Sequence, residues 1–194
     1  MGAGVPERIE EESEIEASIA TKLGDGAEPI ESIDWLREFA KPYQEAWNRH
    51  DPRGVAACAA EDVLWEDPAL PEAARGRDEV ASFVATGVTA FSDLRFAAAG
   101  EPAISDDRLV AYLPWRMLGT NDGPLDPPGF APTGKAVDIE GIDVLQFRGG
   151  LIWRYRAVYD FSDLAQQLGL LPPRGGAAES VIVRLQRLRS RLPL

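Results

Sequence analysis

The chain of 194 residues is 45% hydrophobic and carries a formal net charge of −12 at pH 7, which fits one domain with tails. Its negative charge would repel a phosphate backbone, so we expect no nucleic-acid binding, and no apolar run approaches the length of a membrane span. The single cysteine, Cys58, excludes a disulfide within the chain, and the single histidine, His50, offers little for a histidine-based zinc site.

The N-terminal segment is strongly acidic. Residues 7–16 contain six glutamates and are followed by turn residues without a strong period. We therefore interpret residues 1–28 as an acidic arm that is flexible or loosely docked. Because a secretory signal would begin with basic residues and continue with apolar ones, this N-terminus predicts a cytoplasmic protein.

The central region, residues 29–171, begins with helical patterns. Apolar side chains recur at helical intervals over residues 33–47, with Ser32 as the N-cap, and Pro42 should kink or divide this helix. A second helix would open at Pro52 and lead into a buried strand that ends at Asp67. Residues 77–91 predict a third helix.

Strand patterns follow these helices. They cover residues 93–104, 108–119, 135–147 and 151–160, and the last two are joined by a glycine-rich hairpin. Helices followed by a run of antiparallel strands predict an α+β fold, in which a cone-shaped, curved antiparallel or mixed sheet wraps around the N-terminal helices. The concave face of such a sheet would line an open pocket.

Two further elements complete the central region, and a tail follows it. Residues 120–134 form a turn-rich loop long enough to be a lid or rim over the pocket, and a closing helix is expected to begin at Ser162. Residues 172–194 read as a linker and a basic amphipathic helix. That helix would bind a membrane surface or an acidic partner, or else cover a hydrophobic patch on its own domain or on a second subunit.

Two carboxyl groups lie on faces that strand alternation predicts to be apolar. Trp65 and Asp67 share one face of their strand, and Asp143 interrupts an apolar row over residues 137–147 unless Gly141 introduces a bulge. Burial would raise the pKa of such a carboxyl group, so one acid could serve as a base and the other as a proton donor. The alternative is that both acids cap turns or face water.

The last strand and the first helix show no such site pattern. Arg154 and Arg156 alternate with Trp153, Tyr155 and Tyr159, which predicts one solvated face and one face that packs the sheet. Tyr43 lies among aromatic residues at helical spacing, and such residues usually belong to the core.

Three segments, residues 43–51, 60–80 and 138–147, resemble the sequence blocks of the ketosteroid isomerases. Those enzymes belong to a wider superfamily of cone-shaped α+β folds, which includes nuclear transport factor two and the SnoaL-like polyketide cyclases. The resemblance spans about residues 40–170. It implies a catalytic pocket for a hydrophobic molecule, and chemistry that requires neither a metal ion nor an organic cofactor.

The resemblance also implies roles for three side chains. Tyr43 matches the helix tyrosine that donates to the developing oxyanion, and Asp67 matches the proton-shuttling aspartate that precedes a proline. Asp143 matches the second oxyanion donor, an aspartate that is kept protonated. The expected reaction is enolisation and double-bond isomerisation of a steroid, terpenoid or polyketide-like ketone. The aromatic residues expected to line its pocket are Trp65, Phe83, Trp115, Phe130 and Phe147.

The same superfamily offers other functions. A SnoaL-like polyketide cyclase typically carries a histidine and an acid on the last strand, where this chain has Tyr155 and Ala157. An epoxide hydrolase would need an inward-facing arginine, and Arg116 or Arg156 could supply it. A non-catalytic ligand-binding protein would have a filled or narrow cone. The exposed sheet face of such cones often pairs, which predicts a homodimer.

Overall fold

The structure is a computed structural model, and it describes residues 26–126, 129–172, 175, 184 and 189. The acidic arm predicted over residues 1–28 therefore lies outside the described residues except for its last three, and so does most of the basic helix predicted over residues 172–194. Glu28 pairs with Phe147 through an isolated antiparallel bridge. None of the helices in the described ranges combines the length and the apolar character that a membrane span needs.

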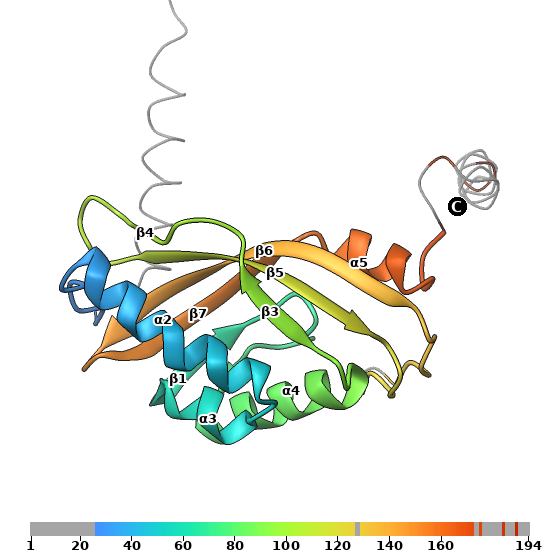
Figure 1. Cartoon of the computed structure of the whole chain (residues 1–194), viewed down its shortest axis with the longest axis horizontal. Coiled ribbons are helices and arrows are strands. Elements are labelled where there is room, and N and C mark those ends of the chain that lie inside the picture. The colour runs from blue at the N-terminus through green and yellow to red at the C-terminus, as the bar shows by residue number, and fades with distance from the viewer. Residues whose placement is uncertain (1–25, 127–128, 173–174, 176–183, 185–188, 190–194) are drawn as a thin grey trace, which may run out of the picture.

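The described residues form helices and strands in the predicted order. The helices are α2 (Ile33–Asn48), α3 (Pro52–Ala57), α4 (Gly76–Ala90) and α5 (Phe161–Gln167). The strands are β1 (Ala59–Glu66), β2 (Ala74–Arg75), β3 (Arg95–Ala98), β4 (Ala103–Ile104), β5 (Ala111–Thr120), β6 (Ala136–Arg148) and β7 (Leu151–Tyr159). In Figure 1, α2, α3 and α4 lie along one side of the long strands, and α5 lies near one end of β6.

The strands belong to one mixed sheet. Their order is β2-β1-β7-β6-β5-β3, and β4 also pairs with β5. β1 and β7 pair in parallel, whereas the other neighbours pair in antiparallel fashion. The long strands β5, β6 and β7 curve over the helices (Figure 1). The predicted α+β fold with a curved sheet around N-terminal helices is thereby confirmed.

Local side-chain chemistry explains where the helices begin. The Ser32 hydroxyl accepts a hydrogen bond from the backbone N–H of Trp35 at 3.1 Å, as a helix N-cap does, and α2 runs through Pro42 without division. The N-cap of the closing helix α5 lies two residues before the predicted cap, Ser162. This cap is the Asp160 carboxylate, which accepts from the backbone N–H of Asp163 at 3.0 Å.

The predicted strand over residues 93–104 is divided into β3 and β4. Both pieces pair with β5, and the segment between them contains Gly100 and Pro102. A proline has no N–H to donate to a ladder and glycine has no side chain to pack, so this segment favours a break in the strand. The break leaves residues 98, 100 and 102 on the wall of the cavity described below.

The hydrophobic core fills the space between the helices and the concave face of the sheet. Its most deeply buried side chains come from both layers; those of Leu36, Val55, Val80 and Val84 belong to the helices, and those of Val63, Trp65, Leu145 and Ile152 to the strands. His50 closes the turn after α2, where its Nε2 lies 2.9 Å from the carbonyl oxygen of Leu94. The single histidine therefore serves the fold.

Candidate functional site

A cavity of about 170 Å³ lies between the helices and the concave face of the sheet. Its walls are mostly apolar and aromatic, and two carboxyl groups, those of Asp67 and Asp143, face it. The described residues that line it include no lysine, arginine or histidine. The chemistry of the cavity therefore depends on two acids and on the groups that donate hydrogen bonds to them.

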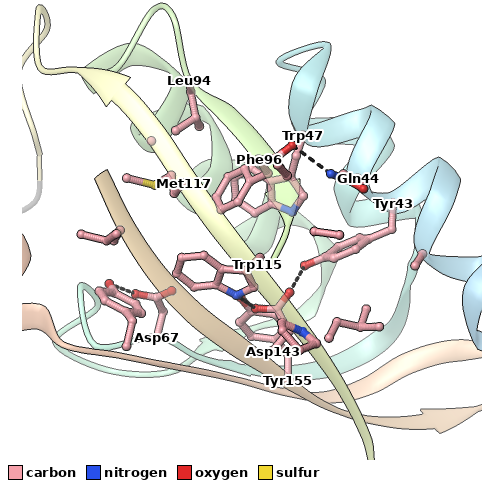
Figure 2. Close-up of a pocket in the computed structure, with 18 of the residues that line it drawn as sticks. Tyr43, Gln44, Trp47, Asp67, Leu94, Phe96, Trp115, Met117, Asp143 and Tyr155 are labelled. Atoms are coloured by element: carbon pink, nitrogen blue, oxygen red, sulfur yellow. Dashed lines mark hydrogen bonds between the residues drawn. The ribbon is translucent and has the colours of Figure 1, made fainter. Parts of the chain in front are cut away.

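Asp143 lies in the middle of β6 and is only 5% exposed. Its Oδ1 accepts hydrogen bonds from the Trp115 indole at 2.7 Å and from the Tyr155 hydroxyl at 2.8 Å. Its Oδ2 accepts from the Tyr43 hydroxyl at 3.2 Å, and Figure 2 shows the carboxyl group among these three rings. Strand alternation correctly places Asp143 on the concave face, because Gly141 stays in register between β5 and β7.

Burial and hydrogen bonding act in opposite directions on this carboxyl group. Removal from water disfavours the charged form, whereas the hydroxyl of Tyr155, the indole of Trp115 and the hydroxyl of Tyr43 favour it. Burial prevails, and the pKa of Asp143 rises from 3.8 to about 7. Near neutral pH the group is thus able to hold a proton in an apolar cavity.

Asp67 lies just beyond the end of β1, on the other side of the cavity (Figure 2). Its Oδ1 accepts from the backbone N–H of Ala69 and from the Tyr159 hydroxyl, each at 2.8 Å. Within the described part of the chain, no hydrogen bond reaches Oδ2. Burial raises the pKa of Asp67, while the two donors oppose that rise. One oxygen is thus held in place and the other is available to a ligand.

The tyrosines at this site remain protonated donors. Burial, followed by the nearby charge of Asp143, raises the pKa of Tyr43 and of Tyr155 well above 10. Burial also raises the pKa of Tyr159, which lies beside Asp67. Tyr43 projects from α2 and stacks on Phe39, with 6.1 Å between the ring centroids.

The three predicted catalytic residues, Tyr43, Asp67 and Asp143, line one cavity. Of the aromatic residues expected to line it, Phe83 and Trp115 do so. The expectation is wrong for the other three, Trp65, Phe130 and Phe147.

Packing explains why these three side chains lie elsewhere. Trp65 is fully buried behind Tyr155, on which it stacks with 3.5 Å between ring centroids. Phe147 is also in the core, in edge contact with Trp35 and Phe39. Phe130 is 40% exposed and belongs to the loop that was expected to form a lid. No described residue of that loop lines the cavity.

Tyr155 and Tyr159 are the site residues that the sequence pattern misses. They were expected to pack the sheet, yet each donates to one of the two carboxyl groups. Alternation along β7 does place both on one face, four residues apart. What it cannot supply is the register of β7 against β6, which pairs Asp143 with Ala157 and so brings Tyr155 beside the acid.

The arginines proposed for an epoxide hydrolase face away from the cavity. Arg116 binds Asp138 through its Nε at 2.7 Å, and Arg156 binds Glu66 through its Nη2 at 2.9 Å. These pairs are about half exposed on the outer face of the sheet, and neither arginine lines the cavity. The cavity therefore lacks the Asp-Arg-Asp arrangement within the described residues.

A curved mixed sheet that closes over helices and an apolar cavity defines the cone-shaped class of folds related to nuclear transport factor two. Within this class, the SnoaL-like domain profile matches residues 40–155, and the chain belongs to that family. No curated protein sequence matches the chain.

Solved structures share this fold at low sequence identity. AclR, a candidate hydroxylase from Streptomyces galilaeus, has a TM-score of 0.62 and 21% identity, over 82% of this chain and 96% of its own. A candidate SnoaL-like polyketide cyclase from Jannaschia sp. CCS1 has a TM-score of 0.62 and 18% identity, over 77% and 100%. A protein with a ketosteroid isomerase-like fold from Catenulispora acidiphila, in complex with trimethylamine, has a TM-score of 0.57 and 17% identity, over 68% and 92%. These likenesses show the fold alone.

Proposed function

We propose that this protein is an enzyme that moves a proton at the carbon next to a ketone and so isomerises a double bond in a hydrophobic substrate. The observation that supports this function is the pair of carboxyl groups on one apolar cavity in different surroundings. Asp143 has three donors and a pKa of about 7, whereas no donor among the described residues reaches Oδ2 of Asp67. Such a pair can divide the roles of acid and base.

In the proposed reaction, Oδ2 of Asp67 removes a proton from the carbon between the carbonyl group and a β,γ double bond. The electron pair of that C–H bond moves into the carbonyl group and forms a dienolate. The hydroxyl of Tyr43 and the protonated Oδ2 of Asp143 donate hydrogen bonds to the dienolate oxygen. Asp67 then returns the proton to the γ carbon, which gives the conjugated ketone and restores the carboxylate.

The lining of the cavity limits the class of substrate. Because its described residues include no cationic side chain, a carboxylate or phosphate would find two acids and no counter-charge. The apolar walls instead suit a neutral ring system with one carbonyl oxygen, as in a steroid, terpenoid or polyketide-like ketone. None of the proposed steps uses a metal ion or an organic cofactor.

The experiment that tests this function measures turnover of a β,γ-unsaturated cyclic ketone by the absorbance of its conjugated product. The variant Asp67→Asn removes the base and should lower the rate by roughly 10²–10⁴-fold, the usual contribution of a positioned acid or base. The matched control is Glu66→Gln, because Glu66 binds Arg156 on the outer face and should not affect the reaction. Undiminished turnover by a folded Asp67→Asn variant would remove Asp67 from this role.

Polyketide cyclisation is the second candidate, and membership of the SnoaL-like domain family favours it. An intramolecular aldol closure begins with the same removal of a proton next to a carbonyl group. Asp67, Tyr43 and Asp143 would then act on a longer substrate that forms a carbon–carbon bond. A cyclic product from a linear polyketide ester, formed without isomerisation of simple β,γ-unsaturated ketones, would favour this candidate over the first.

We also propose that two copies of the chain pair through the outer face of the sheet. Ile142 and Val158 are paired across β6 and β7 and are 39% and 51% exposed. Two ion pairs, Arg116–Asp138 and Arg156–Glu66, flank this apolar patch, so both signs of charge lie beside it. In a twofold dimer, a positive group of one copy can therefore face a negative group of the other.

Light scattering at several protein concentrations tests this pairing. The full chain should have twice the mass of one chain, whereas Val158→Glu should shift it to the single-chain mass, because an unpaired charge would be buried at the contact. A single-chain mass for the unaltered protein would contradict the proposal.

A further inference from the structure

Gly141 occupies a position on β6 where strand alternation calls for an apolar side chain, two residues before Asp143 on the same concave face. Register pairs it with Trp115 of β5. A Cβ atom at position 141 would lie 2.4 Å from Cζ2 and 2.5 Å from Cη2 of the Trp115 indole. The φ angle of Gly141 is outside the left-handed region, so the indole rather than the backbone excludes a side chain here.

Because Gly141 has no side chain, the Trp115 indole packs directly across β6 at this position, which we call the indole seat. From this seat the ring extends along the strand to position 143, where its N–H donates to Oδ1 of Asp143 at 2.7 Å (Figure 2). Phe96 contacts the ring edge to face, with centroids 5.5 Å apart, and Tyr159 contacts it at 5.7 Å. The indole is therefore fixed by glycine on one side and by aromatic rings on others.

This arrangement makes the two oxygens of Asp143 unequal. An indole N–H can only donate, so the oxygen that faces it must act as an acceptor. The Tyr155 hydroxyl reaches the same oxygen at 2.8 Å. A proton on Asp143 is consequently more favourable on Oδ2, which faces Tyr43.

We infer that Gly141 is a positioning residue that, through the Trp115 indole, directs the acid proton of Asp143 to the oxygen facing Tyr43. The use of that proton in catalysis rests on the proposed function, whereas the seat is a property of the free protein. A methyl group at position 141 would displace the indole and leave Oδ1 with one donor fewer.

The test compares Gly141→Ala and Trp115→Phe with the control Gly87→Ala, in the free full-length chain. Gly87 also lines the cavity, but a Cβ there would meet nothing within 4 Å. The readouts are the indole ¹⁵N–¹H signal of Trp115 and the pKa of the Asp143 carboxyl group from ¹³C NMR. The titratable groups that face Asp143 are Tyr43, Tyr155 and Asp67, and all three are kept in every variant.

Gly141→Ala should move the indole signal and raise the pKa of Asp143 by about one unit, because the charged form loses one donor. Trp115→Phe should raise that pKa to a similar extent, and Gly87→Ala should leave the pKa and the indole signal at their wild-type values. An Asp143 pKa that is unchanged or lowered in a folded Gly141→Ala variant would overturn the inference.

A double-mutant cycle on urea unfolding covers the case in which Gly141→Ala folds poorly. If the glycine serves only the indole, Gly141→Ala should destabilise the wild-type chain but cost little or nothing in a Trp115→Ala background. An equal cost of Gly141→Ala in both backgrounds would contradict the inference. Because these readouts need no substrate, a failure of the turnover test would affect the proposed function and leave the seat intact.

Discussion

Asp143 is a carboxyl group that burial pushes toward its neutral form while three donors pull it toward its charged form. The three hydrogen bonds are distributed unequally between its two oxygens. Oδ1 accepts hydrogen bonds from two of the donors, Trp115 and Tyr155, whereas among the described residues only the hydroxyl of Tyr43 donates to Oδ2. Asp67 is the counterpart, because both of its donors in the described part of the chain reach Oδ1 rather than Oδ2. Each acid therefore has one carboxyl oxygen that can contact a substrate in the cavity.

The pKa of Asp143 predicts how stability depends on pH. Its folded value of about 7 lies above the ordinary 3.8, so the folded chain holds a proton that the unfolded chain releases between these values. The free energy of unfolding should therefore fall as pH rises from about 4 to about 7, by up to about 4 kcal/mol from this group. Asp143→Asn mimics the neutral acid and should remove this loss, as urea unfolding at pH 5 and pH 8 would measure. An identical pH dependence in the variant and the wild type would contradict the pKa.

At the scale of elements, β6 shows how much of the site sequence alone could predict. Its alternation is a local property, so it places Asp143 on the concave face, and the proline after Asp67 marks the end of β1. The partners of these acids depend on contacts between strands. Tyr155 reaches Asp143 because β7 pairs with β6 in one particular register, and Tyr159 reaches Asp67 because β7 pairs with β1 in another. No period along the chain specifies either register.

The loop before β6 shows the same limit. Its composition predicts turns, but not what the turns bind. Asn121 is 3% exposed; its amide donates to the carbonyl oxygens of Ala90 and Gly123, and its side-chain oxygen accepts from the backbone N–H of Thr133. These bonds fasten the loop to the end of α4 and away from the cavity wall. Phe130 therefore lies outside the site, although its residue type suits an apolar pocket.

At the scale of the whole molecule, the described charges are sorted by face. Arginines on the outer face pair with acids such as Asp138 and Glu66, whereas the cavity contains acids without any cation among its described lining residues. The electrostatics inside the cone are thus set by Asp67, Asp143 and the donors around them. The fold supplies the apolar walls that make those few hydrogen bonds effective.

The central claim is that these two acids divide the roles of base and proton donor. Titration of their ¹³C-labelled carboxyl groups by NMR in the free protein, assigned with Asp67→Asn and Asp143→Asn, tests it most directly. Asp143 should titrate near 7. The division of roles requires Asp67 to titrate at a lower pH, so that one acid is neutral while the other is charged. Titration of Asp143 near 3.8, or of Asp67 above Asp143, would contradict the account.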